Sequence, residues 1–330
     1  MRGPAWLLLG ALLCTTRAEA DPTVWQRVTE PEARNEARAR KRAEQLFDQS
    51  SEASSDDLEL SRELSLGSAA LLSLSGGAKR DPWQQVLLGR VLLDAQVGRE
   101  REAIALISRG VAALPDSDFK RASLFDLGIG SLVVGDMGRA ERAFTAALAL
   151  AWDPDYRARV HRNRSKVRML SGRLAGAVSD ARIAVRLARG TELVALSHFG
   201  LGVALERSGD YPEGMREIAR GVAVRLPVPP YQSESVLELP SLRWVPEYDV
   251  HYYRALAAMT EATTAGVEED SVVASYEAAL VDWEQYLQAA EALKDRFAVN
   301  ARRHQQRCVD ALARLQKAPR SLPPASGRGR

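Results

Sequence analysis

The sequence predicts an all-α fold in which helix-turn-helix repeats stack into a solenoid. The first observation is an internal repeat marked by four glycines spaced 37 residues apart, namely Gly98, Gly135, Gly172 and Gly209. The second is a small residue five positions after each glycine: Ala103, Ala140, Ala177 and Gly214. The third is a composition dominated by Ala, Leu and Arg, which suits helices.

This pattern has a simple physical meaning. A glycine lets the chain turn with positive φ at low cost, so each marks the turn inside one helix pair. The small residue lets the two helices approach closely, and the residue four positions later fills the space beside it: Ile107, Phe144, Ala181 and Ile218. One pair cannot bury its apolar faces alone, so neighbouring pairs must stack.

The second unit carries the clearest motif, with Leu124, Leu127, Gly128, Gly135, Ala140, Phe144 and Ala147 in order. This spacing resembles the tetratricopeptide repeat family, whose usual period is 34 residues. The resemblance covers about residues 84–227 and includes Pro115 at the end of the first unit. It implies a right-handed solenoid that serves as a protein-binding scaffold, with degenerate caps at both ends.

The remaining elements follow from local signals. Opposite charges alternate along a predicted helix from Pro31 to Phe47, and Asp56 and Asp57 begin a second, so residues 21–80 form an N-terminal helical hairpin. Five prolines between 227 and 246 exclude a continuous helix there. The predicted order is then four repeats within 81–227 (81–115, 118–152, 155–189 and 192–227), a Pro/aromatic-rich loop at 228–248, helices within 249–317 (249–265, 268–291 and 293–317), and a disordered tail at 318–330.

The first twenty residues have the pattern of a secretory signal peptide. Arg2 precedes a short apolar run from Trp6 to Cys14, and Ala18-Glu19-Ala20 forms a small-x-small cleavage site. The sequence therefore predicts an exported, periplasmic protein without a membrane span after cleavage. Lipid attachment at Cys14 is the alternative, although Leu13 stands where a small residue is expected. Cys308 is then the one remaining cysteine, and we expect it to be buried.

A basic face on the third repeat is the main candidate site. Arg159, Arg162, Asn163 and Lys166 follow the i, i+3, i+4, i+7 spacing of one helix face. In the tetratricopeptide family this face lines the concave groove, and members that bind acidic tails use such residues, so the resemblance implies a carboxylate-binding patch. The alternatives are a merely solvated face, or one covered by Glu234 and Glu238 of the Pro-rich loop.

An apolar stripe accompanies this patch. Phe125, Ile129 and Phe199 stand at related positions and are predicted to line the concave face, where they would take a partner helix or an extended peptide. The aromatic residues of the 228–248 loop leave a second possibility open, in which the groove is filled by the protein's own loop.

Two further predictions are structural. Arg164 stands where other repeats have Leu127 and Leu201, so a half-buried guanidinium needs a partner, and Asp180 is predicted to supply it. His161 and His198 share a repeat position and are predicted to be packing residues.

The sequence contains no motif for an enzyme. None of the four histidines lies three to five residues from another, which argues against a local metal motif. Phosphate-binding loops and nucleophile elbows are absent from the sequence, so we expect no catalytic residue and no cofactor. A formal net charge of +2 argues against nucleic-acid binding. The prediction is a non-catalytic protein-interaction scaffold exported to the cell envelope, with a structural subunit of a homo-oligomeric or envelope assembly as the alternative.

Overall fold

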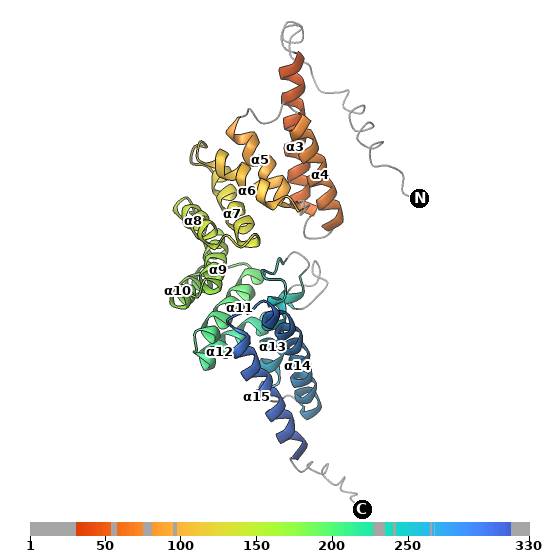
Figure 1. Cartoon of the computed structure of the whole chain (residues 1–330), viewed down its shortest axis with the longest axis vertical. Helices are drawn as coiled ribbons and strands as arrows, with labels where there is room; N and C mark the ends of the chain where they lie inside the picture. Colours follow the sequence, from red (N-terminus) through yellow and green to blue (C-terminus); the bar gives the residue numbers. More distant parts are fainter. Residues whose placement is uncertain are drawn as a thin grey trace, which may run out of the picture. The chain divides into compact units, whose positions relative to one another are not determined.

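The computed structural model describes residues 31–53, 58–74, 81–94, 98–226, 235–239, 242–264, 266 and 268–317. The predicted signal peptide, Asp56, Asp57, Glu234 and the predicted tail lie outside these ranges. Over the described ranges the fold is all-α, as predicted, and consecutive helices pack in pairs (Figure 1). The chain forms two compact units that meet between Leu150 and Ala151.

The described part of the first unit contains three helix pairs. They are α3 (Pro31–Ala53) with α4 (Leu58–Leu74), α5 (Pro82–Asp94) with α6 (Glu100–Val111), and α7 (Asp118–Val133) with α8 (Met137–Ala149). The α7/α8 pair shows how the repeat motif works. A Cβ atom added at Gly128 would lie 2.5 Å from Cε1 of Phe144, so only glycine admits the large ring that follows the small Ala140.

The second unit begins with the third and fourth repeats. These are α9 (Pro154–Leu170) with α10 (Leu174–Leu187), and α11 (Thr191–Arg207) with α12 (Tyr211–Ala223). The turn glycines Gly172 and Gly209 adopt φ values of +77° and +99°, as the repeat pattern predicts. Asp153 caps α9 by accepting a hydrogen bond from the Tyr156 amide at 2.6 Å, with Pro154 in the first turn.

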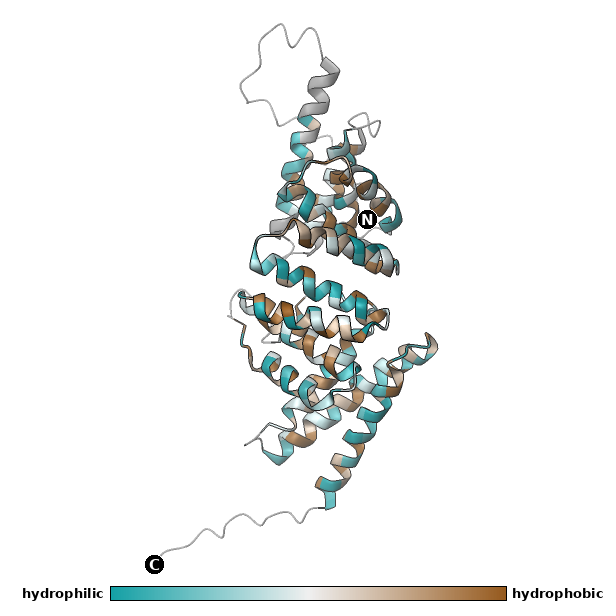
Figure 2. Cartoon of the chain, turned by 90° about the vertical axis from the view of Figure 1, so that its left-hand side faces the viewer, coloured by the Kyte–Doolittle hydropathy of each residue, from teal (hydrophilic) through white to brown (hydrophobic). Residues whose placement is uncertain are grey.

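Four more elements follow among the described residues of this unit. They are a 3-10 turn, η1 (Val236–Glu238), and the helices α13 (Asp249–Glu261), α14 (Glu269–Ala292) and α15 (Ala298–Lys317). The last helix begins five residues later than the predicted Leu293, because Lys294 adopts a φ of 55° and breaks the helical path. Hydrophilic and hydrophobic residues alternate along the helical ribbons (Figure 2).

Aromatic packing forms the centre of the second unit. Tyr252 of α13 and Trp283 and Tyr286 of α14 are fully buried, and both α14 rings meet Tyr252 edge-on at centroid distances of 4.9 Å. Cys308 is buried nearby, as predicted, and burial raises the pKa of its thiol to about 11. Across the described ranges, no helix is both long and apolar enough to span a bilayer.

A buried carboxylate ties these helices to the fourth repeat. Glu206 of α11 accepts hydrogen bonds from the Tyr252 hydroxyl of α13 and from Nδ2 of Asn300 of α15, the latter at 3.1 Å. Its Oε1 also lies 2.7 Å from Nε2 of His304 of α15. One side chain of the last regular repeat therefore contacts both α13 and α15.

Candidate partner-binding site

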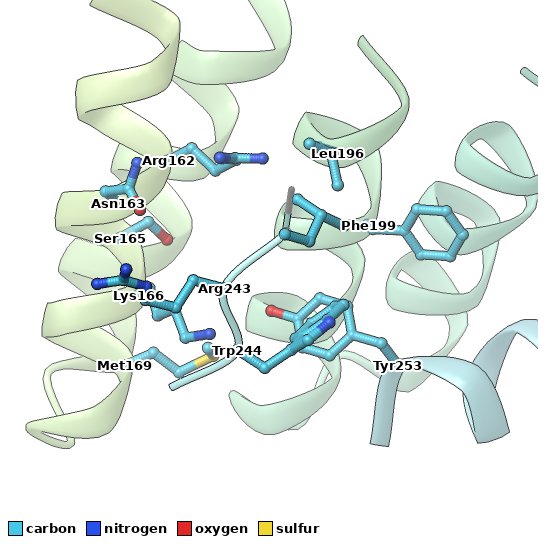
Figure 3. Close-up of a pocket in the computed structure, with 12 residues that line it drawn as sticks. Arg162, Asn163, Ser165, Lys166, Met169, Leu196, Phe199, Arg243, Trp244 and Tyr253 are labelled. Carbon is cyan, nitrogen blue, oxygen red and sulfur yellow. The ribbon is translucent and has the colours of Figure 1, made fainter. Parts of the chain in front are cut away.

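A small cavity of about 80 Å³ lies inside the second unit (Figure 3). Its wall comes from α9, α11, the α13 residue Tyr253 and a short extended stretch, Leu242–Trp244, which we call the capping segment. Its lining comprises Arg162, Asn163, Ser165, Lys166, Met169, Leu196, Phe199, Gly200, Leu242, Arg243, Trp244 and Tyr253.

The repeat register explains the character of the two helical walls. Since α9 and α11 are first helices of successive repeats, residues 37 apart occupy equivalent positions. Arg162 is thus equivalent to Phe199, and Asn163 to Gly200. The α9 wall is consequently cationic and polar, whereas the α11 wall is apolar.

The predicted basic face divides between cavity and solvent. Arg162, Asn163 and Lys166 line the cavity, whereas Arg159 is exposed and does not. The Asn163 amide is partly used locally, because its Nδ2 donates to the Arg159 carbonyl at 2.9 Å. Arg162 extends from α9 towards Leu196 (Figure 3). Burial lowers the pKa of its guanidinium, with Glu192 acting in the opposite direction.

Lys166 is a largely buried cation of the cavity. Its side chain is 16% exposed, its Nζ lies 3.9 Å from Oδ2 of Asp249, and it stands 5.4 Å above the centre of the Trp244 ring. Burial lowers the pKa of this amine to about 8; Arg207 and Arg162 act in the same direction, and Asp249 opposes them. Within the described residues Lys166 donates no hydrogen bond, so its ammonium remains available to an anionic ligand.

Asp249 is already committed to another cation. Nη2 of Arg207 donates to its Oδ1 at 2.5 Å, and the two side chains are 0% and 1% exposed. Its Oδ2 is buried without a hydrogen-bond partner among the described residues. The sequence analysis missed this pair, because 42 residues separate its members and neither belongs to the repeat motif.

The three predicted apolar residues are divided between the two units. Phe199 points away from the cavity in Figure 3 and packs in the core, where a Cβ atom on Gly221 of α12 would lie 2.9 Å from its ring. Phe125 and Ile129 belong to α7 of the first unit and are not among the residues that line the cavity. Phe125 packs edge-on against Phe144 at a centroid distance of 5.7 Å. Phe199 and Phe125, two residues of the predicted apolar stripe, therefore pack between helices.

The capping segment covers part of the basic face, but not through acidic groups. Trp244 meets the Tyr253 ring edge-on at 5.0 Å, and Leu242 packs against the same core. Of the two acids predicted to cover it, Glu238 is exposed and is not among the cavity-lining residues, and Glu234 lies outside the described residues. The cover that the capping segment provides is apolar and aromatic.

Arg164 and Asp180 are in direct contact, as the sequence suggests. The guanidinium donates from Nε to Oδ2 at 2.9 Å and from Nη2 to Oδ1 at 2.8 Å. Arg168 also reaches Asp180, with its Nη1 2.9 Å from Oδ2. Although burial disfavours the Asp180 carboxylate, His161, Arg164 and Arg168 together lower its pKa.

The histidines do more than pack. Nδ1 of His161 lies 2.8 Å from Asp180, and Nδ1 of His198 lies 2.7 Å from Glu217. Both histidines and both acids are 37 residues apart, so the pair is itself a repeated feature. His161 is buried, as a packing residue should be, and the contact with an acid is an additional feature of both positions. The signal was present in the sequence, as an acid 19 positions after each histidine.

No cluster of His, Cys, Asp or Glu that could hold a metal ion occurs in the part of the chain that the structure describes. The arrangement at the cavity offers cations, one amide and aromatic rings. These groups suit recognition of a carboxylate that is attached to an apolar or aromatic group.

This fold and site define a tetratricopeptide-like α-solenoid with a cationic cavity between two successive repeats. No protein-family model and no curated protein matches the chain. A solved structure described as MamA MSR-1 C2 is 15% identical, with a TM-score of 0.45, over 58% of this chain and 95% of that one. The Rap conjugation gene regulator of the plasmid pLS20, in complex with the Phr peptide, is 14% identical with a TM-score of 0.42, over 94% of this chain and 84% of that one. Both TM-scores lie below 0.5, so the fold assignment rests on the helix pairs and register of this chain.

Proposed function

We propose that this protein is a non-catalytic interaction scaffold, exported to the cell envelope, that binds an acidic segment of a protein or peptide partner. The observation that carries the proposal is the cationic wall of the cavity. Arg162 and Lys166 project from one face of α9, and the nearest carboxylate to Lys166 is bonded to Arg207. A ligand carboxylate would give these cations the charge-assisted hydrogen bonds that they lack within the described residues.

Export is the second part of the proposal. It is supported by the basic start, the apolar run and the Ala18-Glu19-Ala20 site of the first twenty residues. The periplasm is the compartment that this pattern favours. Processing is checked by N-terminal sequencing of the protein recovered from the cell envelope, where a mature start at Asp21 is expected.

Affinity capture from an envelope extract tests the binding role. The bait is the mature chain, compared with an Arg162→Gln/Lys166→Gln variant that keeps polar side chains but removes both cavity charges. Arg157→Gln/Arg182→Gln is the matched control, because it removes two exposed charges of the same repeat away from the cavity. The proposal expects a partner that the wild type and the control capture and the cavity variant loses; equal capture by all three would contradict it.

One observation favours a second function. Leu242 and Trp244 already fill the apolar side of the cavity, as they would in a structural subunit that binds nothing there. This alternative predicts no captured partner together with a solution mass above that of a monomer. Light scattering of the same purified protein distinguishes the two.

A further inference from the structure

The capping segment resembles a ligand bound to its site. Building on the proposed function, we propose that Leu242–Trp244 is an internal substitute for the partner, and that the partner segment is extended and carries an acidic residue between an aliphatic and an aromatic one. The partner would displace the capping segment and place its acid where Arg243 now lies.

The first argument is geometric. The segment is not helical, and residues 242 and 244 both contribute apolar side chains to the cavity lining. Leu242 and Trp244 are half-buried against the core, whereas Arg243 between them is exposed. All three residues line the cavity, so the segment lies along it as a bound peptide would.

The second argument is electrostatic. Arg243 adds a third cation to a cavity that Arg162 and Lys166 already line. Its side chain extends from the capping segment towards α9 (Figure 3). No ion pair of Arg243 or Arg162 is found among the described residues. An Asp or Glu at this middle position would bring a negative charge to a cavity that Arg162 and Lys166 line, which an arginine cannot do.

The capping segment is thus held by the apolar contacts of Leu242 and Trp244, while the charge of Arg243 does not match the cationic cavity. Trp244 stacks over Lys166 and meets Tyr253, which stabilises the closed arrangement. Tethering also helps it, because a linked segment competes at an effective concentration on the order of 1 mM. A partner with an acidic middle residue could still displace the segment, since exchanging a positive for a negative charge there is expected to change the affinity about tenfold, which corresponds to about 1.4 kcal/mol.

The test uses two synthetic peptides and an opened protein. The peptides span residues 239–248, one with the natural sequence and one with Arg243→Glu. The protein is the mature chain with Trp244→Ala, checked for native circular dichroism and melting, and Leu242→Ala serves as a second opened variant. Peptides with Trp244→Ala are the controls for aromatic recognition.

We expect fluorescence anisotropy to show the Arg243→Glu peptide binding about tenfold more tightly than the natural peptide at low salt, with the gap narrowing as salt rises. The peptides that lack the tryptophan are expected to lose most of their affinity. Equal affinities of the Glu and Arg peptides would overturn the proposal. So would failure of both to bind either opened variant.

The full-length chain gives an independent result. Arg243→Glu in the otherwise natural protein is expected to strengthen self-capping and reduce partner capture about tenfold. Arg303→Glu, at an exposed position of α15, controls for the change in net charge. Unchanged capture by Arg243→Glu would overturn the proposal. If capture still depends on Arg162 and Lys166 while the peptides do not bind, the proposed function stands and this inference fails; if the peptides bind as expected but no partner is captured, the proposed function fails instead.

Discussion

The third and fourth repeats have the same helix and turn spacing, but they carry different side chains at equivalent positions. Arg164 and Arg168 of α9 are equivalent to Leu201 and Leu205 of α11, which are buried. Both repeats keep a histidine and an acid 19 residues apart, in hydrogen-bond contact. The third repeat adds Arg164 and Arg168 of α9 to that pair, whereas the fourth has leucines at these positions and its acid, Glu217, pairs with the exposed Arg220.

The difference shows that the repeat motif specifies the helix spacing and the turns, but it does not specify the residues at the other positions. A 37-residue register needs glycine at its turns and small residues at its close contacts, and both repeats have them. The other positions can carry charged residues when the repeat also supplies a side chain of opposite charge. In the third repeat this freedom produces a cationic α9 next to an apolar α11, and the cavity lies between them.

The largest expected effect comes from removing the acid of the third repeat. Asp180→Ala leaves His161, Arg164 and Arg168 without their shared partner and is expected to cost about 3–5 kcal/mol in the free energy of unfolding. Glu217→Ala in the fourth repeat is the matched variant and is expected to cost about 1–2 kcal/mol. Urea unfolding of both measures the difference, and equal costs would contradict the comparison.

The same site has a pH dependence of known sign. The folded-state pKa of Asp180 is lower than its ordinary value, so its stabilisation is complete above about pH 4 and is lost as the pH falls through the folded pKa. Asp180→Asn is expected to flatten this acid-side loss of stability. A variant whose acid unfolding curve runs parallel to the wild-type curve would show that Asp180 contributes little to it.

A smaller effect is expected at the buried amine of the cavity. Lys166→Met replaces it with an apolar side chain, as Val203 does in the fourth repeat, and is expected to raise the free energy of unfolding by about 1–2 kcal/mol at pH 7. The Lys166 pKa of about 8 lies below its ordinary value, so the cost of the buried charge is complete below pH 8 and is relieved as the pH rises.

The pH series supplies the check. The stability gap between Lys166→Met and wild type is expected to narrow from pH 7 to about pH 9.5. Measurements stop there because burial raises the pKa of Tyr253 and Tyr252, whose ionisation in the unfolded chain lowers stability above about pH 10. A gap that stays constant with pH would contradict the assignment of the effect to the amine.

The turns are expected to respond alike in both repeats. Gly172→Ala and Gly209→Ala each place a side chain at positive φ, at a cost of roughly 1 kcal/mol. The added Cβ at Gly172 would also meet the Arg296 guanidinium, which is on an exposed and flexible side chain and can move. Thermal unfolding measures both, and a much larger loss at Gly172 would show that Arg296 is held in place.

The smallest effect is expected when the ion pairs of the third repeat are removed as a whole. Arg164→Leu/Arg168→Leu/Asp180→Asn removes both cations and the buried negative charge together, so no buried charge is left unpaired. Replacing a whole buried ion pair is commonly neutral or stabilising, so the change in the free energy of unfolding is expected to stay below about 1 kcal/mol. A loss comparable with that of Asp180→Ala would mean that the ion pairs themselves stabilise the repeat.

The sequence predicted the periodic features and missed those that depend on distant contacts. The repeat glycines, the helix pairs and the Arg164–Asp180 contact all lie within one 37-residue unit, so spacing alone relates their members. Arg207 and Asp249 come from different elements across a proline-rich stretch, and no periodic pattern relates them.

The candidate site illustrates the same limit. Helical spacing placed Arg162, Asn163 and Lys166 together, but it could not show that Trp244 would stack over Lys166. Nor could it show that Phe199 would turn towards α12 instead of the cavity, because both faces of α11 are apolar and buried. Periodicity finds the faces of a helix, and tertiary packing decides which neighbour each face meets.

The contacts of Glu206 bear on how long this array of repeats can be. A further hairpin would have to pack beyond α12, where α13 lies instead, and Glu206 ties that helix and α15 to the fourth repeat. An additional 37-residue unit inserted after Ala223 would therefore have to break these buried contacts. The same unit inserted between α10 and α11 would leave these contacts of Glu206 intact. The contacts of Glu206 therefore limit the addition of repeats at the carboxyl-terminal end of the array.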